Sequence, residues 1–62
     1  MERTREFYEN LMKECATNLQ GYYGRLYNTY LYSDDEVKDA FCYDLNEHSI
    51  KDMMDFIMYI EG

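Results

Sequence analysis

The sequence contains no proline, no tryptophan, one histidine and two cysteines among 62 residues. A zinc site on sulfur needs closely spaced cysteine or histidine pairs, whereas this chain has only His48 and no Cys-x-x-Cys pattern. Cys15 and Cys42 lie far apart in a chain without secretory features, so we expect them to be reduced and partly buried rather than disulfide-bonded. We therefore expect no metal and no cofactor.

Long hydrophobic runs are missing too. The longest, Phe56 to Ile60, is far shorter than the roughly 20 residues needed to cross a bilayer. The N-terminal Met-Glu-Arg-Thr-Arg-Glu has no apolar signal core. We expect a soluble protein that stays where it is made, in the cytoplasm.

Patterns of catalytic residues are equally scarce. His48 and Ser49 are adjacent, a spacing that points side chains apart on a helix. Gly21 and Gly24 lack the lysine and Ser/Thr of a phosphate-binding loop. Because a domain this small buries only about 60% of its unfolded surface, little volume remains for a substrate pocket. We expect no enzymatic activity.

The residues that are present indicate a folded chain, with 47% hydrophobic and 31% charged. Residues 2 to 19 repeat apolar side chains at helical spacing, which predicts an amphipathic helix. Its apolar positions are Phe7, Tyr8, Leu11, Met12, Cys15 and Leu19.

Residues 21 to 32 are ambiguous, because tyrosine and threonine favour strands while two glycines weaken helices. The apolar residues fall within a roughly 140° arc at helical spacing, which favours a helix. A strand would need a partner, and the only candidate is the same segment of another subunit. The sequence leaves open whether the chain breaks at Gly21 or the first helix continues.

A third helix is predicted from Asp34 to Tyr43, because Ser33 and Glu36 have the spacing of a capping box. It is expected to bury Val37, Ala40 and Phe41.

After a turn at residues 46 to 49, Ser49 with Asp52 is expected to cap a last helix from Ile50 to Ile60. Phe56 and Tyr59 should project away from its core side. A helix that is apolar on more than one side is usually buried on more than one side, so we expect a homodimer or a partner-binding patch. The predicted core side comprises Ile50, Met53, Met54, Ile57 and Ile60.

These helices and the absence of proline predict an all-α fold. We expect residues 1–62 to form a single acidic domain, a small and dimeric bundle of three to four helices.

Thirteen acidic residues against six basic ones give a formal net charge of −7. Such a charge disfavours binding to nucleic acid or to an anionic membrane. Residues 1–31 hold four acids and four bases, whereas residues 32–62 hold nine acids and two lysines. This one-sided charge predicts a basic partner.

Some of these acids also have structural roles, because carboxylates in the first turn of a helix are favoured by its dipole. Asp35 and Asp39 lie about 6 Å apart along the predicted helix, a spacing comparable to that of neighbouring phosphates. We expect Tyr43, Phe56 or Tyr59 to supply apolar contacts. The predicted partner-binding residues are Asp34, Asp35, Glu36, Asp39, Asp44, Glu47, Asp52, Asp55, Tyr43 and Tyr59.

In size, acidity and lack of a catalytic motif, the chain resembles the small host-takeover proteins of lytic bacteriophages, and among these the DNA-mimic inhibitors of HU-type nucleoid proteins. The resemblance covers the whole chain and is one of composition. It implies an inhibitor in the host bacterial cytoplasm whose carboxylates occupy a basic DNA-binding surface. The alternative is a self-assembling helical adaptor or regulatory module that binds a protein through exposed aromatic residues.

Overall fold

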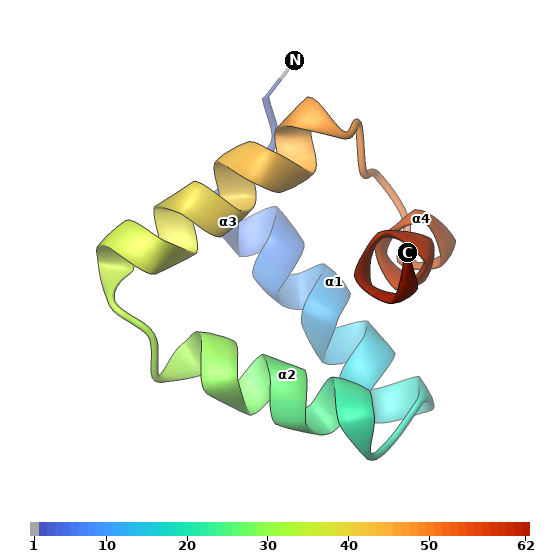
Figure 1. Ribbon diagram of the computed structural model, residues 1–62. Helices are drawn as coiled ribbons and strands as arrows, with labels where there is room; N and C mark the ends of the chain where they lie inside the picture. Colours follow the sequence, from blue (N-terminus) through green and yellow to red (C-terminus); the bar gives the residue numbers. More distant parts are fainter. Residues whose placement is uncertain (1) are drawn as a thin grey trace.

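The computed structural model describes residues 2–62, which contain four helices and no strand. This confirms the predicted all-α fold. The central helix α1 contacts the other three, which surround it (Figure 1). No helix within residues 2–62 is long and apolar enough to cross a membrane. The helices are α1 (Arg5–Asn18), α2 (Tyr22–Leu31), α3 (Asp35–Glu47) and α4 (Met53–Glu61).

Helix α1 supplies half of the core. It begins after Thr4, whose side chain accepts a hydrogen bond from the Phe7 amide at 3.2 Å. Its buried residues recur at the helical spacing that the sequence predicts. The eight buried hydrophobic residues are Tyr8, Leu11, Met12 and Cys15 of α1, with Tyr30, Leu45, Ile50 and Phe56. Both cysteines are free, with Cys15 buried and Cys42 half-buried, as the sequence predicts.

The chain breaks between α1 and α2, which answers the question that the sequence leaves open at Gly21. The Leu19 amide closes α1 on the carbonyl of Cys15 at 2.7 Å. Gly21 then adopts a φ of 90°, a left-handed conformation that glycine adopts without steric penalty. Residues 22 to 31 are helical, so the helix favoured by periodicity is confirmed over the strand.

Helix α3 differs from its prediction at both ends. Asp34 is its N-cap, and the Ser33 hydroxyl donates back to the carbonyl of Thr29 at 2.8 Å, so the predicted capping box is wrong. Ser33 lies one residue too early and closes α2 instead. The helix also continues to Glu47, one turn beyond the predicted end, which brings Leu45 into the core.

The predicted buried face of α3 is wrong at two of its three residues and confirmed at Phe41, which packs against the core. Val37 is 53% exposed and Ala40 is exposed, while Phe41 is half-buried. Leu45 is fully buried and Cys42 packs against the core. The helix is therefore rotated so that the side chains of Phe41, Cys42 and Leu45, rather than Val37 and Ala40, face α1.

The turn between α3 and α4 is a Schellman motif built on serine. Ser49 has a φ of 56°, its amide bonds to the carbonyl of Asn46 at 3.0 Å, and the Ile50 amide bonds to that of Leu45 at 3.1 Å. Leu45 and Ile50 are both buried, which supplies the hydrophobic contact of this motif. Ser49 therefore ends α3, and its predicted role as the N-terminal cap of the last helix is wrong.

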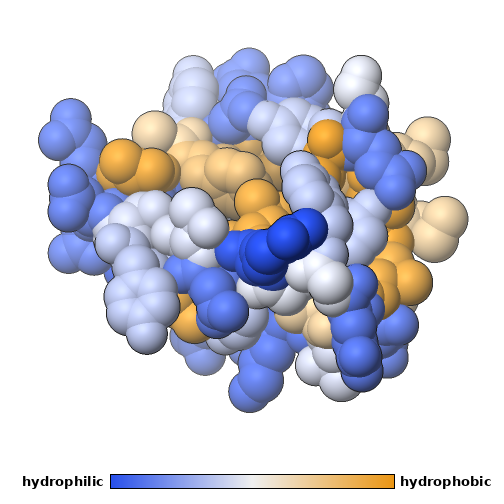
Figure 2. All heavy atoms as spheres, turned by 60° about the horizontal axis from the view of Figure 1, so that its bottom comes forward, coloured by the Kyte–Doolittle hydropathy of each residue, from blue (hydrophilic) through white to orange (hydrophobic). Residues whose placement is uncertain are grey.

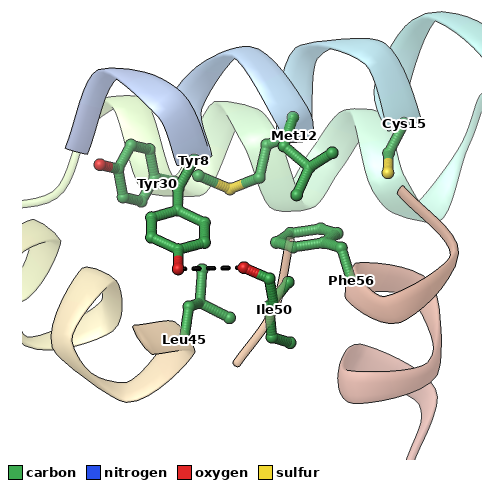
Figure 3. Packing of buried hydrophobic residues seen from close by; sticks show 8 residues of the cluster. Tyr8, Met12, Cys15, Tyr30, Leu45, Ile50 and Phe56 are labelled. Carbon is green, nitrogen blue, oxygen red and sulfur yellow. Dashed lines mark hydrogen bonds between the residues drawn. The ribbon is translucent and has the colours of Figure 1, made fainter. Parts of the chain in front are cut away.

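Helix α4 starts at Met53, after the N-cap Asp52, whose carboxylate accepts from the Asp55 amide at 2.9 Å. Four of the five residues on its predicted core side are confirmed, because Ile50 is buried and Met53, Ile57 and Ile60 pack against the core, but the fifth, Met54, is not buried and Phe56 is. Phe56 is fully buried, whereas Met54 is 62% exposed and Met58 is 65% exposed. Figure 3 shows the Phe56 ring turned toward α1, among the other core side chains. Its predicted role in partner contact is therefore wrong, because no partner reaches a buried ring.

Candidate protein-binding surface

Helix α3 turns an exposed row of acidic residues away from the core. Glu36, Asp39, Tyr43 and Glu47 fall within about 80° of arc on the helix, opposite Leu45. All four are exposed, and Tyr43 is 62% exposed at the middle of the row. We call these four residues the acidic face of α3.

The charge of this helix is large for its length. Residues 34–47 contain six acids and one lysine, which gives five of the seven net negative charges of the chain. A surface of one sign attracts and steers an oppositely charged partner. The predicted residues that lie on α3 or its N-cap are Asp34, Asp35, Glu36, Asp39, Tyr43, Asp44 and Glu47.

Arg5 of α1 reaches this helix and partly neutralises it. Its guanidinium Nη1 lies 3.1 Å from Asp39 and 3.4 Å from Asp35, and its Nε lies 3.6 Å from Glu9. The hydrogen bond to Asp39, with the nearby charge of Asp35, raises the pKa of Arg5. One arginine among three carboxylates leaves the site negative. Asp35 and Asp39, the two acids whose spacing is comparable to that of neighbouring phosphates, are therefore both paired with Arg5.

Asn46 fastens α3 to the N-terminal segment. Its Oδ1 accepts from the Arg3 amide at 2.8 Å and from the Tyr8 hydroxyl at 3.0 Å, while its Nδ2 donates to the Arg3 carbonyl at 3.2 Å. The same hydroxyl lies 3.1 Å from the carbonyl oxygen of Ile50, the dashed line of Figure 3, so its single proton is shared between these two acceptors. Together with Arg5, these bonds fix the position of α3 on α1.

Tyr43 stays a neutral hydrogen-bond donor on the acidic face. The carboxylate of Glu47, as a hydrogen-bond acceptor and a neighbouring negative charge, raises the pKa of the Tyr43 hydroxyl. A neutral tyrosine offers a partner an apolar ring together with a donor and acceptor.

The other candidate residues lie on α4 or its N-cap rather than on α3. Asp52 caps α4 and lines an open groove of 710 Å³ along α1, together with Lys13 and Lys51. Asp55 is half-buried. Tyr59 is half-buried too, and its ring lies 5.1 Å from that of His48, so it joins the end of α3 to α4.

His48 in turn lies 3.6 Å from Asp44, one helical turn earlier. Of the ten predicted partner-binding residues, seven lie on α3 or its N-cap and three lie on α4 or its N-cap.

An apolar hollow that the sequence does not reveal lies between α2 and α3. It measures 140 Å³ and is almost entirely apolar. Figure 2 shows hydrophobic atoms recessed in the left half of the view, bordered by hydrophilic atoms at the left edge. The hollow is lined by Met12, Leu26, Thr29, Tyr30, Ser33, Val37 and Phe41.

Comparison with known proteins gives no match to any family model, curated protein or solved structure. Within residues 2–62, no three His, Cys, Asp or Glu side chains are grouped closely enough to hold a metal ion. The acidic face of α3 is the candidate functional surface of the described residues.

Proposed function

We propose that the protein binds the basic DNA-binding surface of a bacterial DNA-binding protein of the HU type and blocks access of DNA to it. The observation that carries this proposal is the acidic face of α3, a row of exposed carboxylates around Tyr43 on a helix with a net charge of −5 over residues 34–47.

The row has the dimensions of a short stretch of nucleic acid backbone. Glu36 and Glu47 are separated by about 16 Å along the helix axis at a rise of about 1.5 Å per residue. DNA-binding proteins position themselves mainly by hydrogen bonds and ion pairs to phosphates from lysine and arginine. Carboxylates along one helix offer those same side chains an alternative set of acceptors.

The acidic face is also held in place before binding. Arg5 pairs with Asp35 and Asp39, and the Asn46 side chain bonds to Arg3. A surface that is already ordered loses less entropy when it binds. Arg5 neutralises part of the negative charge of Asp35 and Asp39, but it also holds these two carboxylates in place.

The test is competition for DNA at a purified HU-type nucleoid protein. We expect the chain to displace fluorescent duplex DNA, and its affinity to fall steeply as salt rises, because exposed charges are screened. The decisive variant is the double substitution Glu36→Lys with Glu47→Lys, on the acidic face. Its matched control is Glu6→Lys with Glu14→Lys, which makes the same charge change on exposed positions of α1.

Loss of displacement in the α3 variant and its retention in the α1 variant would support the proposal, provided that circular dichroism shows both folded. Equal loss in both variants would mean that only the total charge matters. Binding that is indifferent to salt would contradict the proposal.

A second candidate is self-assembly, in which the chain acts as a helical adaptor. It is supported by Met54 and Met58, two exposed methionines that form an apolar strip on α4. A chain with so small a hydrophobic core often needs further burial, such as oligomerisation, to be stable. A second copy of the chain is the proposed occupant of this strip. Light scattering should then report a dimer that Met54→Lys with Met58→Lys converts to a monomer, and a monomeric wild-type chain would overturn this candidate.

A further inference from the structure

The apolar hollow between α2 and α3 lies directly beside the most acidic turn of the chain. Met12 and Tyr30 are buried at its base, while Val37 and Thr29 are exposed. Ser33 also lines it, so two of its lining residues, Ser33 and Val37, flank the three consecutive acids of residues 34–36.

The size of the hollow matches one side chain. An apolar cavity of about 150 Å³ holds a single benzene molecule, and this hollow measures 140 Å³. One leucine, isoleucine, methionine, proline or phenylalanine side chain fits that volume, whereas a helix or an extended peptide does not.

The surrounding charge selects what carries that side chain. Asp34, Asp35 and Glu36 are all exposed. Of the six basic residues of the chain, only Arg5 pairs with one of these three acids within residues 2–62. A basic protein surface is favoured beside the hollow, while nucleic acid and anionic lipid are repelled.

This inference rests on the proposed function and narrows its partner class. We propose that the hollow receives the apolar wedge of a basic protein that binds the DNA minor groove. Such proteins insert a Phe, Leu, Ile, Met or Pro side chain between base steps, next to the Arg and Lys that contact the backbone. DNA offers them phosphates and a gap between bases. The acidic turn and the hollow offer carboxylates and an apolar gap.

The geometry thus favours wedge-bearing minor-groove proteins over proteins that read the major groove with a helix. A basic-region leucine-zipper peptide is a suitable comparison, because it carries dense positive charge on a helix that lies in the major groove.

The test uses a purified HU-type nucleoid protein and a version whose intercalating residue is replaced by alanine. Two substitutions fill the hollow from opposite walls, Val37→Trp from α3 and Thr29→Phe from α2. Val37→Thr is the matched control, because it keeps the volume of the side chain. We expect either filled variant, or the alanine wedge, to weaken binding about five- to tenfold, which is the effect of withdrawing a few buried carbon atoms.

Filling the hollow should add no further loss when the wedge is already alanine, and it should leave binding of the leucine-zipper peptide unchanged. Equal, salt-sensitive binding of all variants would overturn the wedge inference while the proposed function stands. No binding of the HU-type protein by the wild-type chain would overturn both. Two filled variants guard against one that fails to fold, which circular dichroism would reveal.

Discussion

Arg5 of α1 donates a hydrogen bond from Nη1 to Oδ1 of Asp39 on α3 at 3.1 Å. The contact joins the two helices and places the positive charge of Arg5 at the edge of the acidic face. This contact has two opposed effects on the affinity for a basic partner. It fixes the position of the carboxylates, which favours binding, and it neutralises part of their charge, which disfavours binding.

We expect neutralisation to dominate, so that Arg5→Gln strengthens binding of the HU-type protein about two- to fivefold at low salt. The gain should shrink as salt rises. Isothermal titration at two salt concentrations measures it. Arg25→Gln, an exposed position of α2, removes the same charge away from this contact and is expected to have a smaller effect. Weaker binding of Arg5→Gln would instead show that fixing the carboxylates matters more.

Phe56 should be among the most costly residues to truncate. It is fully buried, and its ring lies 6.4 Å from that of Phe41. We expect Phe56→Ala to lower the free energy of unfolding by about 3–5 kcal/mol, which is close to the whole stability of so small a domain. Met54→Ala, at a 62% exposed position of the same helix, should cost less than about 1 kcal/mol. Urea unfolding followed by circular dichroism compares the two, and equal costs would contradict the buried face described for α4.

The contrast between α1 and α4 explains how much of the fold the sequence predicts. In α1 the apolar positions form one stripe with charged residues opposite, so periodicity alone identifies the buried face. In α4 nearly every residue from Met53 to Ile60 is apolar, and periodicity has no polar face with which to choose. Met53, Ile57 and Ile60 pack against the core as predicted, but Phe56 rather than Met54 is buried, and this choice depends on how α4 packs on α1.

The candidate surface shows a different limit. The acids of α3 and its N-cap are predictable from charge and spacing, since six acids fall within residues 34–47 and five of them are exposed. The role of Arg5 is not predictable from the sequence. Arg5 belongs to the half of the sequence with no net charge, and it meets Asp35 and Asp39 only through tertiary packing. The apolar hollow is hidden for the same reason, since α1, α2 and α3 each supply part of its lining.

The two aspartate caps should differ in their contribution to stability. The Asp52 carboxylate accepts from the Asp55 amide at 2.9 Å, whereas Asp34 makes no side-chain hydrogen bond at the start of α3. We expect Asp52→Ala to cost about 1 kcal/mol and Asp34→Ala clearly less. Urea unfolding measures both costs. A larger cost at Asp34 than at Asp52 would mean that the Asp34 side chain does cap α3, which would contradict the prediction.

Ser49 offers a stabilising substitution. Its φ of 56° lies in the left-handed region, where a residue with a Cβ is disfavoured relative to glycine. We expect Ser49→Gly to raise the free energy of unfolding by about 0.5–1 kcal/mol, and Ser49→Val to lower it. Because the position is exposed, neither change removes a core contact. A neutral or destabilising glycine would show that the serine hydroxyl contributes more than the relief of backbone strain.

The stability of the chain should fall at alkaline pH through its hydrogen-bonded tyrosines. The Tyr23 hydroxyl donates to Glu61 at 2.6 Å, and this bond raises the pKa of Tyr23 to about 12 from its ordinary 10. Burial and a 3.0 Å bond to Glu9 raise the pKa of Tyr30 as well. Since the native state holds these protons more tightly than the unfolded state, their contribution is complete below about pH 10 and is lost as pH rises through the native pKa.

We therefore expect the free energy of unfolding to decline between about pH 10 and 12, with proton release on unfolding that Tyr23→Phe reduces by up to one proton. Urea titrations across this range, with tyrosinate absorbance to follow ionisation, measure both quantities. Tyr32→Phe is the control, because Tyr32 is 90% exposed and its hydroxyl makes no hydrogen bond within residues 2–62. An unchanged pH dependence in Tyr23→Phe would mean that the contact between α2 and the end of α4 does not hold the proton, and that other groups with raised pKa values, such as Tyr30 and Tyr43, produce the alkaline transition.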